Sequence, residues 1–209
     1  MAGLSGTIVG IIDYQSGNVR SITNAFETLG ARVVLIRDAA DVSSVSHMVL
    51  PGVGAFGFCA EKLTQSGLIP AIHEWTFAMR RPMLGICVGM QLLAQNSDEL
   101  GMHDGLGWFE GVVRRLHADS PLVRIPHVGW NTAVFEQPFG DFAVGDSSDF
   151  YFDHAYAFQP QGADAPLALS THGQTFAAAL RRDNLVAAQF HPEKSQAAGM
   201  RFLRGFLEL

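Results

Sequence analysis

The first ninety residues repeat one pattern, in which an apolar run of strand length meets a turn and then a helix-like segment. Strands that alternate with helices form right-handed crossovers, and these place the strands in one largely parallel sheet with helices on both faces. We therefore predict a doubly wound α/β fold, with Asn18 capping the first helix and Gly30 ending it. The expected strands occupy residues 7–13, 32–36, 47–50 and 82–87, and the expected helices residues 18–29 and 55–80.

The second half of the sequence has a different pattern: short β-like runs between residues 105 and 185 are broken by glycine and proline. The runs include residues 112–116, 149–158 and 175–181, and they predict antiparallel strands added to the central, mostly parallel sheet. Residues 185–190 are expected to form one more strand, and the spacing of the late apolar residues predicts a closing helix. The apolar positions of that helix are Met200, Leu203, Phe206 and Leu207.

Length and composition limit the classes of function. With 209 residues, of which 48% are hydrophobic, residues 1–209 are expected to form a single domain. A net charge of -6 with scattered basic residues argues against nucleic acid as a partner. No segment approaches the roughly 18 apolar residues of a membrane span or has the pattern of a secretory peptide, so we expect a soluble, cytoplasmic protein.

The chain has two cysteines, Cys59 and Cys87, which are too few for a disulfide framework and lack the spacing of a zinc site. No metal or cofactor is therefore expected. Cys87 lies in Gly-Ile-Cys-Val-Gly (residues 85–89), the form of a nucleophile elbow in which a strand turns sharply into a helix. A helix N-terminus there favours the thiolate, and backbone N–H groups can stabilise an oxyanion. A buried structural cysteine is the usual alternative, but the glycine frame favours a nucleophile.

A general base for this thiol is available where the last expected strand ends, in Phe-His-Pro-Glu (residues 190–193). His191 can accept the thiol proton and return it to a leaving amine. Residues two apart in an extended segment point the same way, so Glu193 is expected to orient the imidazole. A surface histidine beside a solvated glutamate is the alternative, and the elbow at Cys87 favours a catalytic triad over it.

Residues 51–54, Pro-Gly-Val-Gly, also follow an expected strand and have the backbone freedom to bring an N–H close to a carbonyl oxygen. They could complete an oxyanion hole. A plain turn is the commoner meaning of such a cluster taken alone, but its place along the sheet supports the functional interpretation.

Three ordered motifs, at residues 51–54, 85–93 and 189–195, together resemble the class I, triad-type glutamine amidotransferases. Further segments are similar to the glutaminase subunits of imidazole glycerol phosphate synthases, and the matches run across nearly the whole chain. These segments are residues 12–14, 50–56, 125–131 and 151–154.

The resemblance implies that Cys87, His191 and Glu193 hydrolyse L-glutamine to glutamate and ammonia. It implies that Gln91 and Glu99 hold the amino-acid end of glutamine. Backbone contacts to the reacting carbonyl would come from Gly52, Val53 and Val88. Taken alone, Gln91 could be a solvated helix residue, and Glu99 could be one member of a polar turn at residues 96–99.

The resemblance also implies a partner, a cyclase subunit with a (β/α)₈ barrel that uses the ammonia in histidine biosynthesis. The residues that resemble positions at that interface, or positions that signal across it, are Trp130, Asn131, Tyr151, His154 and Lys194. Each has an ordinary alternative: Trp130 could be core, His154 a hydrogen-bonded strand histidine, and Lys194 a solvated charge.

Two departures from the family pattern leave alternatives open. Residues 14–18 lack the glycine that often follows the tyrosine, and Asp153 replaces an apolar residue. A paralogous glutaminase that supplies ammonia for a surface-sugar precursor is one alternative. A cysteine hydrolase or peptidase is another, because Cys-His-acid geometry alone does not select the amide. A regulatory subunit without turnover is a third, although the retained triad residue types argue against it.

Overall fold

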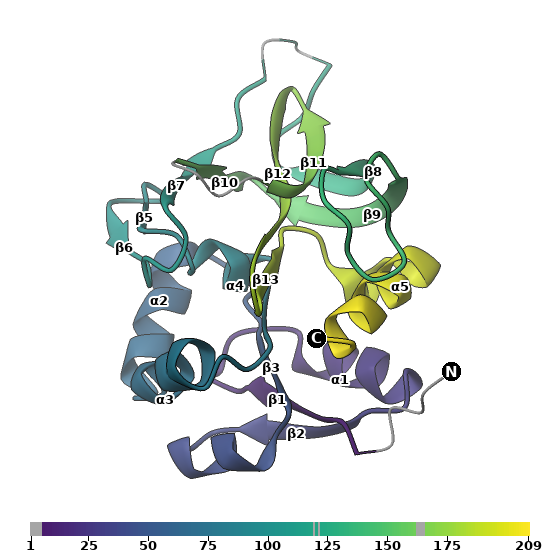
Figure 1. Ribbon diagram of the computed structural model, residues 1–209. Helices are drawn as coiled ribbons and strands as arrows, with labels where there is room; N and C mark the ends of the chain where they lie inside the picture. Colours follow the sequence, from purple (N-terminus) through teal and green to yellow (C-terminus); the bar gives the residue numbers. More distant parts are fainter. Residues whose placement is uncertain (1–5, 119, 121, 162–165) are drawn as a thin grey trace.

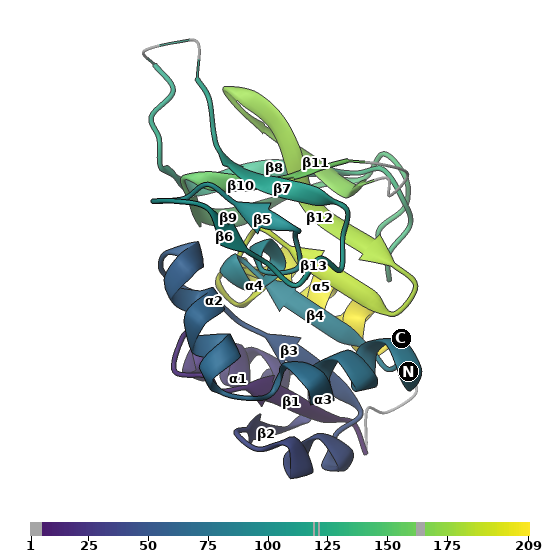
Figure 2. The same cartoon turned by 90° about the vertical axis from the view of Figure 1, so that its left-hand side faces the viewer.

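The computed structural model describes residues 6–118, 120, 122–161 and 166–209. Across these residues the chain forms a nine-stranded sheet and a four-stranded sheet (Figures 1 and 2). The strands of the large sheet are β1 (Ile8–Ile12), β2 (Arg32–Ile36), β3 (His47–Leu50), β4 (Met83–Ile86), β8 (His127–Phe135), β9 (Ser147–His154), β11 (Pro166–His172), β12 (Gln174–Arg182) and β13 (Leu185–Ala188).

The large sheet has two halves that differ in strand direction. Its order is β2-β1-β3-β4-β13-β12-β11-β8-β9. Neighbours from β2 to β13 run parallel, and neighbours from β13 to β9 run antiparallel. The predicted fold class, an α/β sheet with antiparallel strands added in the second half, is confirmed. The smaller sheet, in the order β10-β7-β5-β6, contains β5 (Asn96–Ser97), β6 (His103–Asp104), β7 (Gly111–Arg115) and β10 (Tyr156–Pro160).

Helices cover both faces of the parallel half. Figure 1 shows α2 (Phe56–Gln65) and α3 (Ile69–His73) on one side and α1 (Val19–Thr28) and α5 (Gln196–Leu207) on the other. Strands β3, β4 and β13 are buried throughout, as expected for apolar runs between two helix layers. No helix in the described ranges is long and apolar enough to cross a membrane.

Local details correct two expectations. Asn18 precedes α1 but makes no side-chain capping hydrogen bond, so its predicted capping role is wrong. Gly30 follows α1 with a φ of 89°, as a helix terminator should. The helix expected over residues 55–80 is broken after α2, where Gly67 has a φ of 70°, and it ends in a π-helical turn at Glu74–Ala78.

The parallel half determines where the site lies. The carboxyl ends of β1, β3, β4 and β13 meet at one edge of the sheet, and loops leaving such ends form the usual crevice of open α/β sheets. Leu50 is in register with Gly85, and Ala188 with Ile86. The segments that follow these strands are therefore neighbours, although more than a hundred residues separate two of them.

Candidate active site

Cys87 occupies the sharp turn between β4 and α4 (Val88–Gln91), with φ 54° and ψ -113°. A side chain in this region is strained, and it persists only where the surroundings hold it. The N–H of Cys87 donates to the carbonyl of Ala188 at 2.8 Å. A Cβ added to Gly85 would lie 2.9 Å from the carbonyl oxygen of Gly89, so the elbow requires this glycine. The strained conformation expected from the sequence is therefore present.

The electrostatic support for a thiolate differs from the expectation. Helix α4 has only four residues, so it supplies little of the macrodipole that a longer helix would bring to Cys87. The ionisable group that shares the cavity with the thiol is instead the imidazole of His191, whose pKa the neighbouring Cys87 helps to raise.

His191 follows β13 and is buried, which excludes the surface-histidine alternative. Its N–H donates to the carbonyl of Tyr151 at 2.9 Å. The hydroxyl of Ser195 donates to the carbonyl of His191 at 2.6 Å and accepts the N–H of Tyr151 at 2.9 Å. Strand β9 and the 3₁₀ turn η3 (Pro192–Lys194) thus hold the His191 backbone from two sides.

Glu193 lies beside the imidazole, with Oε1 2.9 Å from Nδ1 of His191. The two side chains are 0% and 4% exposed. The contact was expected from an extended backbone, whereas Glu193 belongs to η3. The turn brings the carboxylate to the ring by curving the chain. Burial lowers the pKa of His191, but hydrogen bonds with Cys87 and Glu193 and their charges outweigh this and raise its pKa to about 10.

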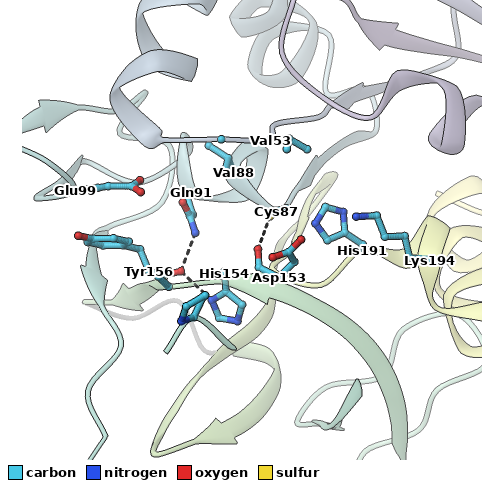
Figure 3. Close-up of a pocket in the computed structure, with 13 residues that line it drawn as sticks. Val53, Cys87, Val88, Gln91, Glu99, Asp153, His154, Tyr156, His191 and Lys194 are labelled. Carbon is cyan, nitrogen blue, oxygen red and sulfur yellow. Dashed lines mark hydrogen bonds between the residues drawn. The ribbon is translucent and has the colours of Figure 1, made fainter. Parts of the chain in front are cut away.

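Cys87 and His191 open into one cavity of about 240 Å³ (Figure 3). Most of the residues expected to bind substrate line it as well, together with Lys194 from η3 and residues of β9 and β10, whereas Gly52 and Glu193 lie behind the lining. Its lining includes Val53, Val88, Gln91, Glu99, Asp153, His154, Tyr156 and Lys194.

Gln91 and Glu99 are both held by hydrogen bonds at this cavity. Gln91 is 2% exposed, and its Nε2 donates to the carbonyl of Tyr156 at 2.8 Å and to Oε1 of Gln189 at 3.0 Å. It is therefore not a solvated helix residue. Oε2 of Glu99 accepts the N–H of Phe56 at 2.7 Å, at the first residue of α2. Its carboxylate is thus fixed by a helix N-terminus and is more than part of a polar turn.

The Pro51–Gly54 segment packs directly on the elbow: a Cβ on Gly52 would lie 2.6 Å from the nitrogen of Gly89. Two of its carbonyls accept hydrogen bonds from side chains outside the segment. The carbonyl of Pro51 accepts the hydroxyl of Tyr14 at 2.6 Å, and that of Val53 accepts the hydroxyl of Ser16 at 3.0 Å. These contacts place Gly52, Val53 and Val88 around the same turn, as an oxyanion hole requires.

Of the two departures from the family pattern, only Asp153 lines this cavity, whereas Gln15 lines a separate one. Gln15, which stands where a glycine often follows the tyrosine, has a φ of 65°. The backbone there keeps the left-handed conformation that glycine adopts easily, so the departure changes the side chain and not the turn. The backbone carbonyl of Asp153 lies 4.0 Å from Sγ of Cys87, and its side chain lines the cavity.

The residues expected at a partner interface separate into an outer and an inner group. Trp130 is 50% exposed, which excludes the core alternative, and its ring meets Tyr151 edge-on at 6.2 Å between centroids. Nζ of Lys194 lies 5.5 Å from the Tyr151 ring. His154 is buried, so its position does not suit direct contact with a partner. Of the two expected roles, only signalling across the interface remains. Asn131 turns its amide toward the buried His127, at 3.2 Å.

Four side chains that hold this site were not singled out from the sequence: Ser16, His127, Gln189 and Ser195. Gln189 and Ser195 lie inside the motif at residues 189–195 and could have been found there. His127 likewise lies inside the segment at residues 125–131, whereas Ser16 acts through a contact with the distant Val53 that no local pattern reveals.

Comparison with known proteins identifies the family that has this arrangement. Residues 10–208 match the family described as "Glutamine amidotransferase class-I". The chain is 40% identical over 212 residues to the imidazole glycerol phosphate synthase subunit HisH of Zymomonas mobilis, covering 100% of this chain and 99% of that protein. It is 42% identical to the HisH subunit of Rhodospirillum rubrum, covering 95% and 97%. The chain belongs to the class-I glutamine amidotransferases, and among them to the HisH subunits.

Solved structures agree on the fold of this amidotransferase. A crystal structure of a glutamine amidotransferase aligns with a TM-score of 0.75 at 21% identity, covering 96% of this chain and 97% of the other. A structure of PurLQS from Thermotoga maritima aligns with a TM-score of 0.76 at 16% identity, covering 97% and 98%. The family match and the curated relatives make the chain a glutamine amidotransferase enzyme, and neither the peptidase nor the non-enzymatic alternative is supported.

Proposed function

We propose that this chain is one amidotransferase domain that hydrolyses L-glutamine and passes the ammonia to a cyclase subunit of the (β/α)₈ barrel type, which makes imidazole glycerol phosphate in histidine biosynthesis. The observation that carries the proposal is the buried pair of His191 and Glu193, of which His191 lines one cavity with Cys87. The names of the relatives favour the histidine pathway over a surface-sugar acceptor.

The proposed reaction has two halves. His191 takes the proton of the Cys87 thiol, Sγ attacks the side-chain amide carbon of glutamine, and His191 passes the proton to the nitrogen as the C–N bond breaks, so a γ-glutamyl thioester forms and ammonia leaves. Water then attacks the thioester, His191 takes its proton, and the thiol is restored as glutamate leaves. Glu193 balances the imidazolium form of His191 in both halves.

The same geometry supports roles for the other cavity residues. Glu99 carries the negative charge suited to the α-ammonium group of glutamine, and Gln91 supplies an amide oxygen beside it. N–H groups of the segments containing Gly52, Val53 and Val88 would hold the carbonyl oxygen as it becomes negative. A cavity of about 240 Å³ suits one amino acid better than a polypeptide segment.

A partner surface is supported by strand β8. Val128, Trp130 and Val134 are exposed, and residues at even spacing on a strand face the same side. Exposed apolar rows of this kind mark protein interfaces. Trp130 contacts Tyr151, which lies under Lys194 at the wall of the cavity. A barrel docked on this row would therefore adjoin the ammonia-producing site.

The proposal is tested by separating the two nitrogen sources. Cys87→Ala, assayed with the cyclase and its ribonucleotide substrate, should abolish glutamine-dependent synthesis and leave synthesis from added ammonia within about twofold of wild type. Cys59→Ser removes the other thiol but keeps a hydrogen-bonding group beside Val53, and it should retain most glutamine-dependent activity. Equal loss with both nitrogen sources in Cys87→Ala would contradict this division of labour.

The isolated subunit is expected to turn over glutamine slowly. Hydrogen bonds from Tyr14 and Ser16 fix the carbonyls of Pro51 and Val53, so aiming an N–H of this segment at the oxyanion would require a change that a docked partner can drive. Glutamine turnover measured with and without the cyclase should rise at least tenfold on complex formation. Full activity of the subunit alone would argue against this gating.

A further inference from the structure

A hydrogen-bonded chain of side chains leads inward from strand β8. Nδ2 of Asn131 lies 3.2 Å from Nε2 of His127, and Nδ1 of His127 lies 3.1 Å from Nε2 of His154. Nδ1 of His154 is 2.9 Å from the carbonyl oxygen of Tyr156. Two buried histidines thus connect a half-buried amide on β8 to the backbone at the wall of the cavity.

The chain continues from that carbonyl to the nucleophile. Gln91 donates from Nε2 to the Tyr156 carbonyl at 2.8 Å and to Oε1 of Gln189 at 3.0 Å. Nε2 of Gln189 in turn lies 3.8 Å from Sγ of Cys87. Figure 3 shows Gln91 and His154 reaching the same Tyr156 carbonyl from opposite sides.

Only one arrangement of protons satisfies the histidine part of this chain. A carbonyl oxygen can only accept, so Nδ1 of His154 carries a proton, and in a neutral ring its Nε2 must then accept. His127 therefore donates from Nδ1 and accepts at Nε2 from the amide of Asn131. The orientation of that amide is fixed independently, because its Nδ2 donates to the carbonyl of Thr171 and its Oδ1 accepts the N–H of Thr132.

Burial keeps this arrangement in place. Burial lowers the pKa of His127 to about 4 and that of His154 to about 3, so both rings are neutral near pH 7. Protonation of His154, which is 6% exposed, would set its Nε2–H donor against the Nδ1–H donor of His127. The rings are also packed, with His127 stacked on Phe152 at 4.8 Å between centroids.

We propose that His127, His154 and Gln189 are positioning residues of glutamine hydrolysis, acting on Gln91 and Cys87 through a hydrogen-bond chain directed toward the Tyr156 carbonyl from both sides. The chain occupies both N–H groups of the Gln91 amide, which leaves Oε1 as the group that accepts the α-ammonium of the substrate. Gln189 directs a donor at the sulfur, with Nε2 3.8 Å from Sγ of Cys87. This inference rests on the proposed function and adds residues that the triad does not include.

The first test compares His154→Asn with His154→Leu, two side chains of similar outline, in the complex with the cyclase. Asparagine can still donate to the Tyr156 carbonyl from the place of Nδ1, whereas leucine, which has the same branched outline, cannot. His154→Leu should raise KM for glutamine about tenfold with kcat within about twofold, as loss of one buried donor implies. His154→Asn should keep KM within about twofold. Equal changes in both variants, or no change in either, would overturn the proposal.

The same comparison at His127 covers the case in which His154→Leu does not fold. His127→Asn keeps a donor toward Nε2 of His154, and His127→Leu removes it. The KM difference between these two variants should have the same direction as at His154. Indistinguishable KM values at soluble, folded His127 variants would refute the directed chain.

The second test measures the reactivity of the Cys87 thiol in the absence of glutamine turnover. Gln189→Met removes the donor to Sγ, so alkylation of Cys87 by iodoacetamide, followed by mass spectrometry of the Cys87 peptide, should slow about fivefold. An unchanged rate would remove Gln189 from the proposal. Because alkylation requires no glutamine, this result decides the positioning role even if the wild-type complex hydrolyses no glutamine, which would be a failure of the proposed function alone.

Discussion

Nδ1 of His191 lies 2.9 Å from Oε1 of Glu193, and both side chains are almost completely excluded from solvent. Within the described residues, the other carboxylate oxygen of Glu193 is buried and has no hydrogen-bond partner. The negative charge of Glu193 is therefore balanced mainly through the imidazole. Since a buried charge without a partner is costly, the pair favours the protonated form of His191.

Glu193→Gln tests this coupling. The amide keeps the shape of the carboxylate but loses its charge, so the imidazolium that forms during each half-reaction is no longer stabilised. We expect kcat for glutamine hydrolysis to fall by a factor on the order of 10²–10⁴, with ammonia-dependent synthesis unchanged. Glu27→Gln, on the exposed face of α1, is the matched control and should stay within twofold of wild type. A Glu193→Gln enzyme with normal kcat would remove Glu193 from the triad.

The positive φ of Cys87 predicts a stability difference between two inactive variants. Glycine adopts a φ of 54° without the steric cost that alanine pays there. Cys87→Gly should therefore be more stable than Cys87→Ala by about 1 kcal/mol in urea denaturation. At Cys59, inside helix α2, the order should reverse, with alanine more stable than glycine by about 1 kcal/mol. The same order at both positions would show that the elbow stores no strain.

The sequence predicted the parallel half of the fold well because its strands are continuous apolar runs bounded by turns. Strand β8 was missed, since polar residues such as Asn131 and Thr132 interrupt its apolar pattern. Strand β11 was missed as well, and it begins at Pro166. An apolar sequence pattern marks a strand because the strand is buried. Strands β8 and β11 are only partly buried, so their pattern is weak.

For the site, the sequence predicted which residues meet but not always how they meet. Cys87 and His191 come together because β4 and β13 are parallel neighbours, which follows from the strand pattern once the sheet is assumed. The contact between His191 and Glu193 depends instead on the turn η3. The chain through His127 and Gln189 depends on long-range packing, and no residue spacing could have predicted it.

His47 offers a test of pH-dependent stability away from the site. Burial lowers its pKa to about 4, below the value of about 6.5 in an unfolded chain. The unfolded state therefore binds more protons between these values, and the stability of the wild type declines as pH falls from about 6.5 to 4. His47→Leu should weaken this decline by up to about 1.4 kcal/mol per pH unit. Parallel curves of unfolding free energy against pH for the two proteins would contradict the assignment.

Gly52 and Gly54 lie in the same segment, but the structure predicts different outcomes for alanine at each. At Gly52 a Cβ would lie 2.6 Å from the nitrogen of Gly89 and 2.8 Å from Cβ of Val88, so the segment or the elbow must move. At Gly54 there is open space, and only its φ of 109° opposes the substitution. Gly52→Ala should therefore lower kcat for glutamine at least tenfold, because it displaces the N–H groups around the oxyanion. Gly54→Ala should mainly lower the unfolding free energy, by about 1 kcal/mol. Steady-state kinetics and denaturation of both variants test this difference. Equal kcat values would mean that the contact between Gly52 and the elbow does not position the oxyanion hole.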